Sequence, residues 1–179
     1  MPWSNDMNKV WVPDFVAAQT GIQRVLEVGV GFGDMGKSLR DRFPELHLRG
    51  IEVWEPYLRD PRFVRPSPYD EGIRVADVRE AEDGWWDEID LTIWIDGPEH
   101  LELGEAQEQL HRLRRLSRIG VLVSTPLGLL PQDAFESNEF ERHCSTWTHD
   151  TWRCLFPDAL RVDGDHQTEC RWLPPESQA

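Results

Sequence analysis

Apolar runs of strand length alternate with stretches of helical periodicity along the chain, a pattern typical of α/β proteins built on a parallel sheet. In the helical stretches apolar residues recur every three or four positions, as Met35, Leu39 and Phe43 do. We expect strands at 24–29, 46–53, 73–77, 89–95 and 119–123, helices at 34–43, 101–116 and 148–156, and a final hairpin of 160–162 with 168–173.

Two of these segments say more about the architecture. Residues 89–95, I-D-L-T-I-W-I, are almost entirely apolar, as expected for a central parallel strand that is covered on both faces. The stretch 56–68 carries prolines at positions 56, 61, 66 and 68, so it cannot form a long helix. We therefore expect a short or irregular crossover there.

A long segment without regular pattern, 127–147, separates the last parallel strand from the helix that follows. Loops of this length are uncommon in compact domains unless they serve a function. This one contains aromatic residues and His143, and we interpret it as a substrate lid. We expect it to belong to a single domain of residues 1–173, which is followed by a polar tail, 174–179.

Composition narrows the class of partner. The 179 residues include 33 acidic and 19 basic side chains, and the net charge of −14 argues against nucleic acid as the main partner. No apolar run approaches the roughly 18 residues of a membrane span, and the N-terminus shows no signal-peptide pattern. Three cysteines without a C-x-x-C motif favour neither a disulfide framework nor a zinc site. We expect a cytoplasmic protein with no metal site, and the oligomeric state is left open.

The most informative motif follows the first expected strand, where glycines stand at positions 29, 31 and 33 before a helix. Glycines at such a turn let the backbone approach a ligand, and the helix N-terminus adds amide donors. The dinucleotide fingerprint G-x-G-x-x-G would require glycine at position 34. This chain has Asp34 there, which would repel a pyrophosphate. A cofactor without phosphate, such as S-adenosylmethionine, fits better.

Acidic residues stand at the ends of the next three expected strands, where α/β folds bind ligands. Glu52 lies 19 residues after Gly33 and is placed to accept hydrogen bonds from ribose hydroxyls. Asp77 and Asp96 end the third and fourth strands. We expect Asp77 near an adenine and Asp96 near the reactive end of the cofactor.

Together these segments resemble the class I S-adenosylmethionine-dependent methyltransferases over about residues 24–162. E-V-G-V-G-F-G is similar to the first motif of that family, I-E-V-W-E-P-Y-L to the second, V-A-D-V to the third and I-D-G-P-E-H-L to the fourth. The resemblance implies a Rossmann-like α/β fold with a mostly parallel seven-stranded sheet, helices on both faces and an antiparallel last strand. The Asn-Pro-Pro-Tyr motif of amino-group methylases is absent after the fourth strand.

The resemblance also implies roles for individual residues. The cofactor contacts would be Glu27, Gly29, Gly31, Gly33, Glu52, Val53, Trp54, Asp77, Val78 and Asp96. V-L-V-S-T-P-L-G (121–128) resembles a poorly characterised subgroup in which a Gln, an Asn, a His and a Trp recur in the following loop. These would be the substrate contacts Gln132, Asn138 and Trp147, with His143 as the acceptor-side base and His100 as a second candidate base.

The sequence therefore predicts methyl transfer from S-adenosylmethionine to a small-molecule acceptor. Two alternatives stay open. One is a lyase or cyclase that acts on S-adenosylmethionine itself, and the other is a non-catalytic scaffold subunit with the same fold. Nicotinamide-dependent oxidation is the least favoured enzyme class, because of Asp34 and the glycine spacing.

Overall fold

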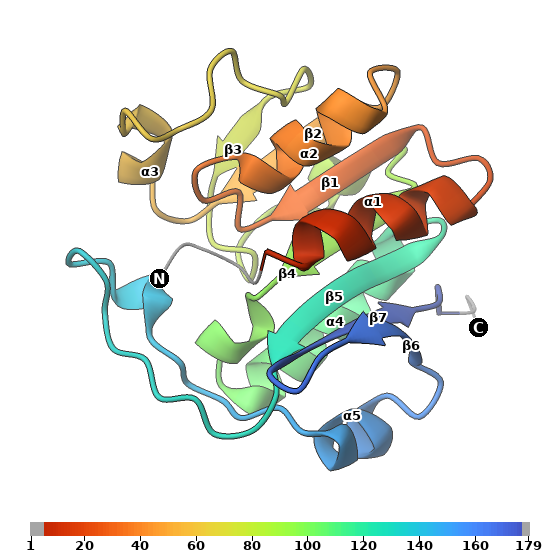
Figure 1. Ribbon diagram of the computed structural model, residues 1–179, viewed down its shortest axis with the longest axis vertical. Coiled ribbons are helices and arrows are strands. Elements are labelled where there is room, and N and C mark those ends of the chain that lie inside the picture. The colour runs from red at the N-terminus through yellow and green to blue at the C-terminus, as the bar shows by residue number, and fades with distance from the viewer. Residues whose placement is uncertain (1–5, 177–179) are drawn as a thin grey trace.

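A seven-stranded sheet forms the centre of the computed structural model, which describes residues 6–176 (Figure 1). The strand order is β3-β2-β1-β4-β5-β7-β6. The strands are β1 (Arg24–Val28), β2 (His47–Glu52), β3 (Ile73–Val75), β4 (Leu91–Ile95), β5 (Gly120–Pro126), β6 (Leu160–Gly164) and β7 (Thr168–Leu173). Neighbouring strands are parallel except where β7 pairs with β5 and β6. The predicted Rossmann-like fold with an antiparallel last strand is confirmed.

Helices cover both faces of the sheet (Figure 1). Helices α1 (Asn8–Ala18) and α2 (Asp34–Arg42) pack on one face, and α4 (Leu103–Leu116) and α5 (His149–Leu155) pack on the other. The remaining turns are α3 (Pro56–Arg59) and the 3-10 segments Asp83–Trp86, Pro98–His100 and Glu139–Glu141. None of the helices within residues 6–176 has the length and apolarity needed to cross a membrane.

Strand β4 shows how the apolar run in the sequence builds two cores. Leu91 and Ile93 face the core under α1 and α2, whereas Trp94 faces the core under α4 and α5. All five residues of the strand are buried, as predicted. Thr92 is tolerated in this setting because its hydroxyl accepts a hydrogen bond of 3.1 Å from the indole of Trp86.

The sequence pattern does not predict helix α1, because Pro13 lies inside it. Proline has no amide to donate to the carbonyl four residues earlier. That carbonyl, of Lys9, accepts a hydrogen bond of 3.2 Å from the hydroxyl of Ser38 in α2 instead. Trp11 and Phe15 are buried in the core, so packing against α2 and the sheet stabilises the interrupted helix.

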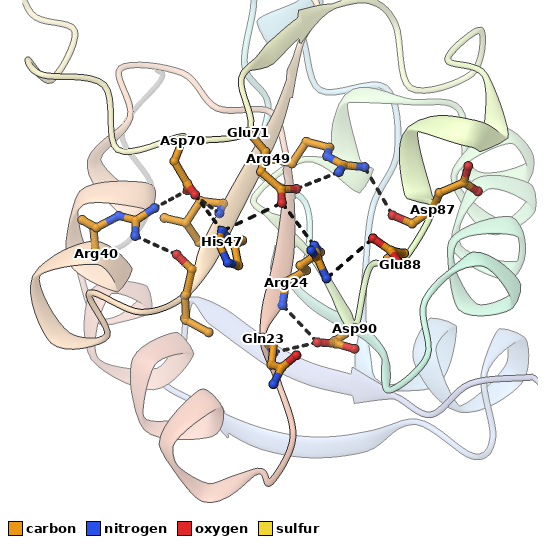
Figure 2. A network of polar contacts seen from close by, with 12 residues as sticks. Gln23, Arg24, Arg40, His47, Arg49, Asp70, Glu71, Asp87, Glu88 and Asp90 are labelled. Carbon is orange, nitrogen blue, oxygen red and sulfur yellow. Dashed lines mark hydrogen bonds and ion pairs between the residues drawn. The ribbon is translucent and has the colours of Figure 1, made fainter.

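Charged side chains hold the amino edge of the sheet together (Figure 2). Arg24 at the start of β1 and Arg49 in β2 both bind the carboxylate of Glu71, with N–O distances of 3.1 and 2.7 Å. Asp90, just before β4, accepts hydrogen bonds of 2.6 and 3.0 Å from the amides of Gln23 and Arg24. The charged side chains of this edge therefore bind one another and the backbone.

Candidate functional site

A cavity of about 480 Å³ opens at the carboxyl edge of the sheet. Its walls come from the ends of β1, β2 and β4, from residues 76–79 after β3, and from residues 138–141 of the long loop. The volume lies in the range of small-molecule sites. The position is the one at which open α/β sheets bind their ligands.

The turn between β1 and α2 has a backbone that glycine adopts readily and other residues do not. Gly29, Gly31 and Gly33 have φ values of +76°, +54° and +85°, in the left-handed region where a Cβ is strained. Gly29 and Gly31 line the cavity. Gly33 is the N-cap of α2, where an added Cβ would meet the ring of Phe63 at 3.4 Å.

Glu52 joins the end of β2 to this turn. Its Oε2 accepts a hydrogen bond from the amide of Gly31 and its Oε1 accepts one from the amide of Trp54, each of 2.8 Å. The residue is 3% exposed and lines the cavity. Burial raises its pKa to about 7, against the opposite effect of the two amides. Each carboxylate oxygen has further lone-pair capacity, so Glu52 can also accept hydroxyl groups of a ligand.

Glu27 is a second buried carboxyl group in the cavity wall. It is 4% exposed and accepts a hydrogen bond of 2.6 Å from the hydroxyl of Tyr69. Burial raises its pKa to about 8, and the neighbouring carboxylate of Glu52 adds to this effect while the Tyr69 bond opposes it. A cationic group bound beside Glu27 would favour the ionised form.

We expect Glu27→Gln to change how stability depends on pH. The folded-state pKa of about 8 lies above the ordinary value of 4.5, so the folded protein keeps a proton that the unfolded chain loses. This stabilisation is complete below about pH 4.5, decreases as the pH rises and is lost above about pH 8. The amide of the variant still accepts from Tyr69 and has no proton to lose.

Denaturant unfolding without ligand at several pH values measures this effect. Between about pH 5 and 8 the variant should gain about 1 kcal/mol or more relative to the wild type, since a difference of one proton changes the free energy by about 1.4 kcal/mol per pH unit. Using the difference between the two proteins removes the contribution of the other titrating groups. Parallel pH profiles would contradict a raised pKa at Glu27.

Asp96 and Asp77 are held in place by neighbouring side chains. Asp96 has a φ of +46°, and its carboxylate accepts hydrogen bonds from the Ser124 hydroxyl at 2.7 Å and the Asn8 amide at 3.2 Å. Asp77 binds the guanidinium of Arg79 through both oxygens, at 3.0 and 2.7 Å. Burial acts to raise the pKa of Asp77, but the bonds from Arg79 hold it below its ordinary value. Both aspartates line the cavity.

A buried polar cluster fastens the long loop to the cavity wall. The hydroxyl of Tyr57 in α3 donates to Oε1 of Glu141 at 2.8 Å and accepts from Nδ2 of Asn138 at 3.1 Å. All three residues are buried and line the cavity. The sequence predicts a site role for Asn138 but not for its partners Tyr57 and Glu141. Nothing in the spacing shows that α3 contacts a loop more than 80 residues later.

The two candidate bases, His100 and His143, lie side by side, with ring centroids 5.0 Å apart. Their Nδ1 atoms contact the carbonyl oxygens of Arg142 at 3.2 Å and Leu130 at 2.6 Å. A carbonyl oxygen only accepts, so Nδ1 carries the proton in both rings and Nε2 carries the lone pair. Burial lowers the pKa of both imidazoles. Of the two, His100 lines the cavity.

Three other predicted contacts do not line the cavity. Trp147 is fully buried under α4 and α5, with its ring 4.3 Å from that of Trp152. This position indicates a packing role in place of the predicted substrate contact. Gln132 lies within the loop and donates a 2.6 Å hydrogen bond to the carbonyl of Glu141. Trp54 faces the ring of Phe140, with centroids 6.4 Å apart.

The charge around the cavity is predominantly acidic. Among the described residues that line it are nine Asp or Glu side chains and two basic ones, Lys9 and Arg79. Arg79 is already paired with Asp77 and Glu105, and Lys9 lies 3.7 Å from Asp34. Such a wall favours a cationic ligand over a phosphate.

Solved structures match the fold at low sequence identity. The N-terminal domain of EvdMO1, solved with SAH bound, aligns with a TM-score of 0.69 over 97% of this chain and 83% of that one, at 18% identity. PH0226 from Pyrococcus horikoshii OT3 aligns with a TM-score of 0.68 over 96% and 90%, at 15% identity. Magnesium protoporphyrin IX methyltransferase (ChlM) from Synechocystis PCC 6803, solved with SAM bound, gives 0.61 over 93% and 78%, at 12% identity. The fold is that of the class I methyltransferases. Neither protein-family models nor curated protein sequences match the chain.

Proposed function

We propose that the protein is an S-adenosylmethionine-dependent methyltransferase that acts on a small molecule. The observation that carries this proposal is an acidic cavity built against the glycine turn of a class I methyltransferase fold. S-adenosylmethionine has no phosphate, and its positive sulfonium and ammonium groups outweigh its one carboxylate, so it suits an acidic wall. Two structural neighbours, the EvdMO1 domain and ChlM, were solved with SAH and SAM bound.

The residues of the cavity fit the nucleoside part of this cofactor. Glu52 would accept the ribose hydroxyls with the lone pairs that its amide contacts leave. Asp77 and Val78 would meet the adenine edge, and Val53 would pack against its face. All four residues line the cavity.

The methionine part would lie beside Glu27 and Asp96. Both are carboxylates of the cavity wall, and opposite charge stabilises a bound ammonium group in a site with little water. Gly29 and Gly31 would let the backbone close on the cofactor. Gly33 serves the start of α2 and therefore acts on the site only through the turn.

The cofactor supplies a methyl group that its sulfonium already activates, so the protein chain has to align the acceptor and exclude water. Asn138, Tyr57 and Phe140 form the wall on the side of the loop and would position the acceptor. His100 lines the cavity with a neutral imidazole and would take a proton from the acceptor where one is released. His143 would hold the imidazole of His100 in position through the contact between the two rings.

Composition bears on the cellular compartment and on the class of acceptor. Cys144, Cys154 and Cys170 are free thiols, which fits a reducing compartment such as the cytoplasm. The net charge of −14 disfavours a nucleic-acid acceptor. The charge therefore agrees with a small-molecule acceptor.

Isothermal titration calorimetry with S-adenosylmethionine and S-adenosylhomocysteine tests the proposal. We expect one site per chain with a Kd of about 1 to 100 μM, and no binding of NADH, because the acidic wall repels its pyrophosphate. Chromatography of the cofactor after incubation without acceptor should show it intact.

Two results would contradict methyl transfer, and each favours a different alternative function. Breakdown of the cofactor without acceptor would replace methyl transfer by a lyase or cyclase reaction. No binding of either compound by protein with a cooperative unfolding transition would contradict both enzyme functions and favour a scaffold subunit.

A further inference from the structure

A cluster of three potential ligands lies where the 3-10 turn after β4 meets the long loop. One side-chain ligand atom from each of Glu99, His100 and His143 lies within 4.8 Å of the others. The sequence predicts no metal site, because it has no C-x-x-C motif and the two histidines are far apart in the chain. The fold brings them together because the amides of Cys144 and Ser145 donate to the backbone carbonyl of Glu99, at 2.7 and 3.0 Å.

Glu99 is the unusual member of this cluster. It is 2% exposed, and its Oε2 has no hydrogen-bond partner within the described part of the chain. Leaving a buried carboxylate oxygen without a partner is costly, and burial accordingly raises the pKa of Glu99 well above its ordinary value. Such a group takes up a proton, pairs with another side chain or binds a metal ion. Oε2 of Glu99 can therefore bind a partner from outside the described part of the chain.

The histidines have the arrangement that metal-binding imidazoles usually show. Each Nδ1–H is directed to a backbone carbonyl, of Arg142 for His100 and of Leu130 for His143. Such a bond fixes the ring orientation and the tautomer, and leaves Nε2 as the nitrogen with a lone pair for a metal ion.

We propose that Glu99, His100 and His143 bind a divalent transition-metal ion. Two imidazoles with one carboxylate are a donor set typical of Zn²⁺ and of Fe²⁺ rather than of Mg²⁺ or Ca²⁺, which prefer oxygen ligands. Ligands of one tetrahedral ion lie about 3.3 Å apart. Closing the cluster on an ion therefore requires side-chain adjustments of about an ångström.

The ion would lie at the edge of the cofactor cavity, because His100 belongs to both the cluster and the cavity wall. Three protein ligands leave a coordination position open, and an oxygen atom of the acceptor would fill it from the cavity. This use rests on the proposed function and points to an acceptor with a hydroxyl group. With the ion bound, Nε2 of His100 is a ligand and takes no proton, so the ion replaces it in that role by lowering the pKa of the hydroxyl group. The metal site itself does not depend on methyl transfer.

The test uses the full chain without a histidine tag, stripped of metal with EDTA. We expect one Zn²⁺ per chain by calorimetry, and visible absorption bands of nitrogen- and oxygen-bound Co²⁺ when Co²⁺ is added. Glu99→Gln keeps the shape and removes the charge, and should lower metal affinity tenfold or more. Its Tm without metal should not fall, since Oε2 makes no hydrogen bond to lose.

Two further variants complete the test. Glu108→Gln makes the same charge change at an exposed position of α4 and should bind metal as the wild type does. His143→Asn keeps a donor for the Leu130 carbonyl and removes Nε2, so it should lose affinity as Glu99→Gln does. No bound ion, or equal affinity and equal Co²⁺ spectra in all variants, would overturn the proposal. Titration of S-adenosylhomocysteine into the stripped protein reports separately on the proposed function.

Discussion

Replacement of Glu52 by alanine is expected to weaken binding of S-adenosylmethionine by tenfold or more. The variant would leave the ribose hydroxyls unpaired, and would also free the amides of Gly31 and Trp54 that the carboxylate now holds. A buried polar group that loses its partner costs about 1–3 kcal/mol, and about 1.4 kcal/mol corresponds to tenfold in Kd. Calorimetry on wild type and variant measures the difference.

Two controls separate loss of the ligand contact from loss of the fold. Glu52→Gln retains one carbonyl oxygen and should fall between the wild type and the alanine variant. Glu45→Ala removes an exposed carboxylate that does not line the cavity, and should bind as the wild type does. Equal affinities for wild type and Glu52→Ala, in proteins with matching unfolding transitions, would mean that Glu52 only shapes the glycine turn.

The elements and the cofactor motifs were predictable because their signals are local in sequence. Gly29, Gly31 and Gly33 stand where the chain needs positive φ angles, and this need is visible in the residue type. Glu52 is the last residue of β2 and Asp96 directly follows β4, and parallel strands bring their carboxyl ends to one edge. The strand pattern alone therefore places both acids in one cavity.

The acceptor side was less predictable because its contacts join distant segments. Tyr57 meets Glu141 through a hydrogen bond across 84 positions, and no periodicity reports such a pairing. Glu99 reads in the sequence as an acidic residue at a helix start, a common arrangement. Its burial becomes visible only when the loop is seen to cover it. Helix α1 was not predicted, because proline normally interrupts a helix. Here the hydroxyl of Ser38 in α2 donates to the carbonyl of Lys9 that Pro13 leaves without its usual donor.

Replacement of Trp147 by alanine is expected to lower the free energy of unfolding by about 3–5 kcal/mol, the usual cost of truncating a buried aromatic side chain. The residue is fully buried and packs against Trp152 in the core under α4 and α5. A domain of this kind has only about 5–15 kcal/mol of total stability, so the loss should be evident in urea unfolding. The affinity of the folded fraction for S-adenosylhomocysteine should not change, because Trp147 does not line the cavity.

Trp147→Phe is the matched control for this prediction. It keeps an aromatic ring against Trp152 and loses the 3.2 Å hydrogen bond from the indole nitrogen to the Ser145 hydroxyl, so its loss of stability should be smaller. If Trp147 contacts the substrate, its replacement should affect methyl transfer more than stability. A Trp147→Ala protein that unfolds within about 1 kcal/mol of the wild type, but transfers methyl groups to its acceptor more slowly, would return Trp147 to the substrate site.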